Sequence, residues 1–242
     1  MDHEIHHRPS EAMVTIALAP GERVVAEAGA LVAHETGIEM ETGARGGVFG
    51  SLKRLVGGES FFVNTFRSPD REATVSFASA LPGDVVTEHV GDGQGELFAQ
   101  SGSFLAAGGG VEVDTTFGGA RSFLGGEGLF LLRLSGDGPV WLSSYGAIEE
   151  RAVPAGETLT VDTGHVVGFR DVEWDVRRVG GLKSTLFSGE GLVSEFTGPG
   201  TVWVQTRSPD AFVAWLSSRL PTGTTASNST GDSGGSDFSV RF

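Results

Sequence analysis

Hydrophobic and polar residues alternate along most of this chain in short runs that are typical of β-strands. The runs are rich in Val, Leu, Phe and Thr, and glycine or Pro-Gly pairs separate them every eight to fifteen residues. Alternation with a period of two buries one face of a strand, and the Pro and Gly positions favour turns between strands. The pattern therefore predicts an all-β fold with many tight turns.

Four kinds of landmark recur three times in the same order, which indicates an internal repeat. A turn with proline and glycine comes first, at Leu18–Glu22, Leu81–Asp84 and Val153–Glu157. A glycine that leads into an apolar strand follows, at Gly29, Gly102 and Gly164. An alternation of apolar and acidic residues comes third, at Ile38–Glu41, Val111–Asp114 and Val172–Asp175. A Gly-Glu pair opens the next apolar strand, at Gly58–Glu59, Gly126–Glu127 and Gly189–Glu190.

These landmarks predict how the chain is organised. Three repeats, at about residues 13–80, 81–152 and 153–207, are expected to pack into one domain over residues 13–220, because one repeat cannot bury its strands alone. Ser208-Pro209-Asp210 predicts the start of a helix over 209–220. The helix presents Phe212, Trp215 and Leu216 at helical spacing and is expected to close the fold. Residues 1–12 are expected to be a mobile segment, and the Ser/Thr/Gly-rich residues 221–242 a disordered tail.

The net charge of the chain limits the classes of binding partner that we expect. The 31 acidic residues exceed the 17 basic ones, so that the formal net charge is −14 at neutral pH. Such a surface repels nucleic-acid phosphates, and no nucleic-acid partner is expected. Two of the basic residues are lysines, Lys53 and Lys183. An acidic surface with so little lysine favours adaptation to concentrated salt, where counterions screen the self-repulsion. The alternative is an ordinary acidic protein.

The absence of cysteine and the hydropathy pattern limit the chemistry and the cellular location that we expect for this protein. The chain contains no cysteine, which excludes disulfides, thiol catalysis and cysteine-ligated metals. No apolar run approaches the ~18 residues of a membrane-spanning helix, and the first residues lack a signal-peptide pattern. The expected location is the cytoplasm, and peripheral association with a membrane is left open.

Candidate ligand-binding residues come from the acidic alternations. Six carboxylates would form a band around a threefold arrangement of repeats and bind a hard cation such as Ca²⁺; they are Glu39, Glu41, Glu112, Asp114, Glu173 and Asp175. The alternative is that they line the solvated faces of three half-buried strands, and this is the favoured interpretation. The six histidines, at positions 3, 6, 7, 34, 89 and 165, show no pair with the spacing of a metal site on a strand. No resident cofactor or metal is predicted.

Other motifs are weaker as indications of catalysis or binding. Gly231–Gly235 matches the nucleophile segment of trypsin-like proteases, but Ser233 lies in the low-complexity tail without a histidine nearby. The glycine clusters that begin at Gly46, Gly118 and Gly180 are better explained as loops than as phosphate-binding loops. The four tryptophans occupy positions that are expected to face the core.

Several of these segments together resemble the altered-inheritance-of-mitochondria protein 24 family over about residues 13–207. The segments are Glu27–Val32, Gly58–Phe62, Gln100–Ala106, Ser188–Leu192 and Gly198–Gly200. The resemblance implies a fold similar to the tryptophan RNA-binding attenuator protein, a short variant of the double-stranded β-helix. It also implies a link, in mitochondrial members, to inner-membrane organisation and biogenesis. The family supplies no catalytic or ligand residues to transfer to this chain.

The function predicted from these observations is that of a non-catalytic intracellular scaffold that acts through protein contacts and self-assembly. No assembled catalytic set is visible in the sequence, and we do not expect an enzyme. The alternative is a module that binds a small ligand or a cation in a barrel-like cavity or on the acidic band.

Overall fold

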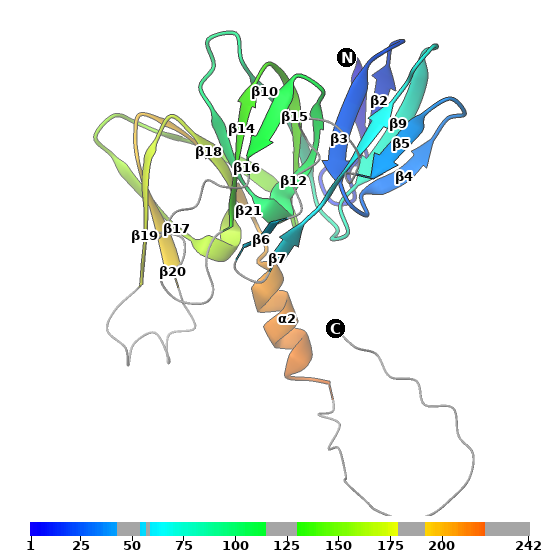
Figure 1. The fold of residues 1–242 in the computed structure, drawn as a ribbon. Helices are drawn as coiled ribbons and strands as arrows, with labels where there is room; N and C mark the ends of the chain where they lie inside the picture. Colours follow the sequence, from blue (N-terminus) through cyan, green and yellow to red (C-terminus); the bar gives the residue numbers. More distant parts are fainter. Residues whose placement is uncertain (43–53, 57–58, 115–129, 179–191, 221–242) are drawn as a thin grey trace, which may run out of the picture.

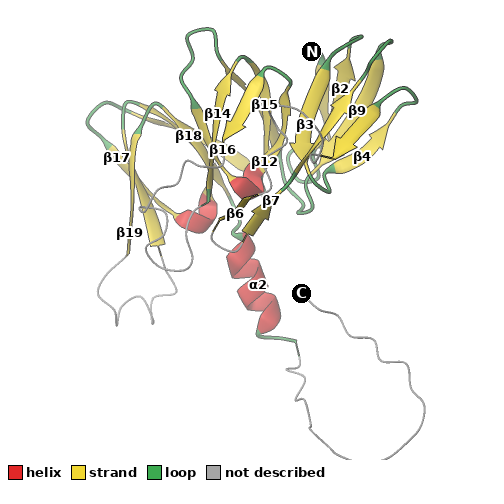
Figure 2. Cartoon of the chain, viewed as in Figure 1, coloured by secondary structure: helices red, strands yellow, loops and turns green. Residues whose placement is uncertain are grey.

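The computed structural model describes residues 1–42, 54–56, 59–114, 130–178 and 192–220. Over these residues the regular structure is almost entirely β-strand, with one α-helix, α2 (Pro209–Ser217), near the C-terminal end (Figure 2). The prediction of an all-β chain with a short C-terminal helix is confirmed. In these ranges no helix has the length and hydrophobicity to span a membrane.

Most strands fall into three groups of six, which we call units 1, 2 and 3. Unit 1 contains β2 (Met13–Leu18), β3 (Arg23–Glu27), β4 (Leu31–His34), β5 (Glu39–Thr42), β8 (Val63–Arg67) and β9 (Ala73–Ala78). Unit 2 contains β10 (Val85–Val90), β11 (Leu97–Gln100), β12 (Phe104–Gly108), β13 (Val111–Asp114), β14 (Leu131–Gly136) and β15 (Gly138–Ser143). Unit 3 contains β16 (Ile148–Val153), β17 (Thr158–Asp162), β18 (Val166–Arg170), β19 (Glu173–Arg178), β20 (Leu192–Thr197) and β21 (Gly200–Gln205).

A few elements lie outside the six-strand pattern. They are β1 (His3–His6), the antiparallel pair of β6 (Arg54–Val56) and β7 (Glu59–Phe61), and two single 3₁₀ turns at Ser101–Ser103 and Thr163–His165. The 3₁₀ turns immediately precede the third strands of units 2 and 3.

The six strands of each unit pair by the same scheme. The sixth strand lies between the first and the third, and the fifth strand lies between the second and the fourth, always antiparallel. A shift of register also recurs at one place in the third strand. It falls between Leu31 and Ala33, between Phe104 and Ala106, and between Val166 and Gly168. Residues can therefore be matched from unit to unit by their pairing partners.

Each unit encloses apolar side chains between its two sets of three strands. In unit 1 the alternation of β2 turns Val14, Ile16 and Leu18 inward, where they are fully buried with Phe66 and Phe77. Comparable clusters lie in unit 2 and unit 3, and each of the three clusters also includes residues of a neighbouring unit. Burial of these faces is the main stabilising contribution to such a layered β structure.

Two strand pairs join the units into a row (Figure 1). β12 of unit 2 pairs with β3 of unit 1, and β18 of unit 3 pairs with β11 of unit 2. The sheets therefore run from one unit into the next, in the orders β10-β15-β12-β3-β8-β5 and β13-β14-β11-β18-β21-β16. The two ends of the row are the sheets β1-β2-β9-β4 and β17-β20-β19.

One predicted landmark is wrong in unit 2. The turns at Pro20-Gly21 and at Pro154–Gly156 connect the first and second strands of their units, whereas Pro82-Gly83 lies before the first strand of unit 2. Gly83 is required there for another reason, because a Cβ at this position would overlap the carbonyl oxygen of Ser144. The connection that matches the other two turns is residues 91–96.

Helix α2 begins where the sequence predicts. The Ser208 hydroxyl accepts a hydrogen bond of 3.3 Å from the Ala211 amide, and proline stands at the start of the first turn. The prediction that the helix closes the fold is wrong, because none of its residues is buried and it projects from the β units (Figure 1). Trp215 is 52% exposed.

Candidate functional site

The six candidate cation ligands lie on the fourth strands of the three units. Glu39 and Glu41 are on β5, Glu112 and Asp114 on β13, and Glu173 and Asp175 on β19. These three strands end three different sheets. Within the described part of the chain, no three His, Asp or Glu side chains are arranged so that they could hold a metal ion. The structure thus keeps the three pairs apart, with most of the six side chains exposed.

Other sequence candidates divide between described and undescribed residues. Ser233 and the glycine clusters after positions 46, 118 and 180 lie outside the described residues. Trp141 and Trp203 are buried in the core, as predicted, and Trp174 is partly buried. Trp215 contradicts the prediction of four core tryptophans because it lies on the exposed helix.

The contacts between units combine strand pairing with shared apolar clusters, because Leu105 and Trp141 of unit 2 pack with the core of unit 1 and Trp203 of unit 3 packs with the core of unit 2. At the first junction Ala106 lies opposite Ala26 and Ala107 opposite Val25. At the second junction Gly168 lies opposite Ala99 and Phe169 opposite Phe98. All residues of β12 and β18 are buried. The two junctions use the same register, since Ala106 and Gly168 hold matching places in their units, as do Ala26 and Ala99.

Strand β1 reinforces the junction between units 1 and 2. It pairs antiparallel with β2, where His3 lies opposite Ile16. The His3 ring lies edge-on to the ring of Trp141 at 5.2 Å, and its Nε2 hydrogen-bonds the Thr87 hydroxyl at 2.8 Å. Burial lowers the pKa of His3. The neutral imidazole is therefore the form favoured in this contact.

Arg8 attaches the same segment to unit 2. Its Nε and one terminal nitrogen donate to the two carboxylate oxygens of Asp84 at 2.7 and 2.9 Å. Asp84 is 3% exposed and also accepts a hydrogen bond from the Val85 amide. Such a bidentate pair fixes orientation as well as charge. Residues 1–12, which the sequence predicts to be a mobile segment, thus include strand β1 and the Arg8–Asp84 ion pair.

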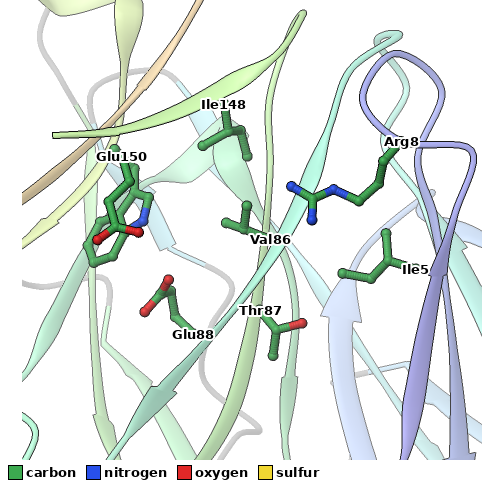
Figure 3. Close-up of a pocket in the computed structure, with 8 residues that line it drawn as sticks. Ile5, Arg8, Val86, Thr87, Glu88, Ile148 and Glu150 are labelled. Carbon is green, nitrogen blue, oxygen red and sulfur yellow. The ribbon is translucent and has the colours of Figure 1, made fainter.

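A pocket lies at the junction between units 2 and 3 (Figure 3). Its volume is about 450 Å³. Val86, Thr87 and Glu88 of β10 line it beside Ile148 and Glu150 of β16, Trp203, Ile5 and Arg8. The Glu88 and Glu150 carboxyl groups face the same space in Figure 3.

Arg170 organises the inner side of this junction. Its guanidinium donates to the His89 carbonyl at 2.6 Å and to the Gln94 side chain, and it lies 3.8 Å from the Glu88 carboxylate. It also lies over the Trp203 ring, 5.8 Å from the ring centre. Burial raises the pKa of Glu88; Arg170 opposes this shift and Glu150 adds to it. Two carboxylates beside one guanidinium leave this end of the pocket acidic.

Over the described residues, the outermost strands of the row lack the partners that their counterparts have within it. β4 is the third strand of unit 1 and matches β12 and β18, and β17 is the second strand of unit 3 and matches β3 and β11. Both are end strands of their sheets over the described residues. Val32 of β4 is 54% exposed, whereas its counterparts Leu105 and Val167 are fully buried. Unpaired strand edges are templates for pairing with another chain.

Sequence reasoning missed both the junction pocket and the open edges. Main-chain pairing carries no motif, so nothing in the sequence of β4 or β17 marks it as an edge. The one available signal was the repeat itself, because a row of like units leaves one unmatched edge at each end.

The structure defines an all-β protein of three successive units that share sheets. The chain belongs to the family described as mitochondrial biogenesis AIM24, whose model matches residues 3–207. The family resemblance seen in the sequence is confirmed. The further expectation of a fold similar to the attenuator protein stays a prediction.

Two bacterial relatives support this membership. The uncharacterized protein M6_Spy0233 of Streptococcus pyogenes serotype M6 is 29% identical over 220 residues, which are 87% of each chain. The crystal structure of protein SPYM3_0169 from Streptococcus pyogenes superposes with a TM-score of 0.76 at 27% identity. That match covers 90% of this chain and 99% of the streptococcal chain.

Proposed function

We propose that this protein is a non-catalytic scaffold that assembles end to end, with β17 of one copy pairing with β4 of the next. The observation that carries the proposal is that the chain already makes this joint twice within itself, at β3–β12 and at β11–β18. Each internal joint pairs the third strand of one unit with the second strand of another. β4 is the remaining third strand and β17 the remaining second strand, and over the described residues the corresponding edge of each is unpaired.

The internal joints specify a register for the joint between copies. Ala33 matches Ala106 and Gly168, and Val161 matches Ala26 and Ala99. Ala33 of one copy would therefore lie opposite Val161 of the next, with His34 opposite Thr160. The joint would also cover Val32, which adds buried apolar area to the main-chain pairing.

The geometry also selects a variant that blocks one edge without disturbing the fold. In β3 the Arg23 carbonyl accepts from Gly109 beyond β12, so Arg23 and Val25 direct their main-chain groups toward unit 2. Thr160 matches Val25, and its N–H accordingly faces the open edge of β17. Proline at position 160 removes this donor but keeps the pairing with β20, and proline is tolerated on such an edge.

Light scattering and native mass spectrometry test the proposal. The unmodified chain is expected to form assemblies that Thr160→Pro and Val32→Asp each reduce to monomers, with unchanged circular dichroism. Thr160→Val keeps the N–H and is expected to keep the assembly. A mixture of the Thr160→Pro and Val32→Asp chains should stop at a heterodimer, because each retains the edge that the other lacks.

Two outcomes contradict the proposal. One is an unmodified chain that stays monomeric up to its solubility limit. The other is an assembly that survives both edge variants, which would place the contact elsewhere.

The alternative function, a module that binds a small ligand or cation, has support in one observation. The pocket at the second junction is large enough for a small molecule and holds two carboxylates beside a tryptophan. A thermal-shift panel of metal ions and metabolites separates this function from assembly, since the edge variants leave the pocket intact.

A further inference from the structure

The pocket between units 2 and 3 corresponds to the place that β1 fills between units 1 and 2. β10 and β2 are the first strands of units 2 and 1, and they pair in the same register. Val86 of β10 lies opposite Leu142, and Val14 of β2 lies opposite Phe77 in the same way. β2 carries β1 on its outer edge, whereas β10 is an end strand of its sheet within the described residues. The pocket lies along β10 at this edge (Figure 3).

The side chains around the two places also match. Trp203 takes the place of Trp141, which the His3 ring contacts, and Glu150 takes the place of Thr87, to which His3 is hydrogen-bonded. Glu88 takes the place of Ile16, the residue opposite His3. The second place therefore keeps the tryptophan of the first but replaces two uncharged neighbours by carboxylates.

The backbone of β10 has the orientation that strand addition requires. In unit 1 the Ala17 amide donates to the Asp2 carbonyl at 2.9 Å, so the main-chain groups of Ala17 and Thr15 face β1. The matching residues in unit 2 are His89 and Thr87. The His89 carbonyl already accepts from Arg170 at this edge, so the main-chain groups of Thr87, two residues away, point the same way.

From this correspondence we infer that the pocket binds an extended peptide of a partner protein, which adds antiparallel to β10 and places a lysine or arginine side chain beside the Glu88 and Glu150 carboxyl groups. An apolar residue two positions later would lie opposite Val86, as Ile5 lies opposite Val14. Addition to a sheet edge gives affinity through the main chain, and the pocket selects the side chain. A cation is preferred because the single guanidinium of Arg170, which already lies over the Trp203 ring, faces two carboxyl groups.

The alternative occupants make different demands on the site. A metal ion would need a third carboxylate or imidazole, and the described residues do not supply such a group. A free cationic metabolite would use Glu88 and Glu150 but not the Thr87 main chain. Strand addition is therefore tested through the backbone of the peptide.

The test is an NMR titration of the Thr160→Pro chain, so that the result does not depend on assembly between copies. The probe is the blocked peptide Asp-Lys-Glu-Ile-His-His, which copies residues 2–7 with lysine in place of His3. We expect shifts at the amides of Thr87 and His89 and at the Trp203 indole. N-methylation of the peptide glutamate, whose N–H would face β10, should abolish binding, whereas N-methylation of the isoleucine should be tolerated.

Protein variants test the charge requirement. Glu150→Thr introduces the residue found at the matching position of unit 2, Thr87, and is expected to weaken binding of the lysine peptide about fivefold. Glu149→Thr is the matched control, since it removes the same charge from the neighbouring residue, which is ion-paired with Arg151 and does not line the pocket.

Three results overturn the inference. They are equal binding of the two N-methylated peptides, equal effects of the Glu149 and Glu150 variants, and shifts from methylammonium alone that equal those from the peptide. The last result would instead assign the pocket to a small cation.

Discussion

At the scale of single residues, Glu27 shows how one carboxyl group makes stability depend on pH. It ends β3, opposite Val63, and burial raises its pKa to about 7 from an ordinary value of 4.5. The folded chain therefore binds this proton more tightly than the unfolded chain does. The stabilisation is fully present below pH 4.5 and is lost as the pH rises through about 7.

Replacing Glu27 by glutamine should remove this dependence. Gln100 holds the matching position in unit 2, so the amide suits the backbone there. We expect Glu27→Gln to raise the melting temperature above pH 7, by about 2–4 °C for each kcal/mol recovered, and to flatten its decline between pH 4.5 and 7. Thermal unfolding followed by circular dichroism across this range measures both effects. Glu11→Gln, at an exposed site, is the control, and equal pH profiles for Glu27→Gln and the unmodified chain would contradict the assignment.

At the scale of elements, the segment that contains β1 holds unit 1 against unit 2 through a few directed contacts. The Arg8 side chain is 49% exposed, but its partner Asp84 is buried. Removing the guanidinium leaves a buried carboxylate without its strongest donor, which costs more than the loss of a surface ion pair.

Arg8→Gln is therefore expected to lower the free energy of unfolding by about 1–3 kcal/mol. Denaturant unfolding measures the change, and Arg67→Gln, at another exposed arginine, is the control for charge. Asp84→Asn completes a double-mutant cycle. Additive effects of the two substitutions would show that the Arg8–Asp84 ion pair contributes no coupling energy.

The elements also show which features the sequence could predict. Alternation located the strands, and the acidic alternations fell on the same strand of each unit. In β13 the apolar residues are buried, as expected for a half-buried edge strand, whereas Met40 of β5 is 52% exposed. The start of α2 followed from Ser208 and Pro209, whose chemistry is local. The exposure of α2 did not follow, because Phe212, Trp215 and Leu216 at helical spacing suit packing on this fold or on another surface equally well.

Long-range features were less accessible. The Pro-Gly pair at 82–83 was assigned to the wrong connection because such pairs mark a turn without saying which strands it joins. The site at the second junction depends on Glu88, Glu150 and Trp203, which come from three strands and share no motif. The site is recognised only by comparing the matching positions of these residues in the repeated pairing scheme.

At the scale of the whole molecule, the row of units has different surfaces at its two ends. A contact between β17 and β4 is heterologous, so copies joined in this way form a closed ring if the rotation per joint closes, or a filament if it does not. The net charge of −14 acts on every such assembly, because like-charged copies repel one another as they approach. Salt therefore bears on assembly as well as on folding.

The response to salt is the prediction that belongs to this scale. Because the chain is acidic and has only two lysines, we expect its melting temperature to rise from low-salt buffer to molar KCl, where the Debye length falls to about 3 Å. The Thr160→Pro chain isolates the effect on folding from the effect on assembly. Sucrose at equal osmolality controls for general stabilisation by excluded solutes.

A charge-reduced chain makes the salt measurement specific. Glu39, Glu112 and Glu173 are exposed on the fourth strands of the three units, and changing all three to glutamine removes three negative charges without touching the core. The rise in melting temperature with KCl should become smaller in this variant because there is less repulsion to screen. An equal melting temperature in low and molar KCl for the unmodified chain would contradict adaptation to salt. An equal rise in the two chains would show instead that the stabilisation does not come from screening of these carboxylates.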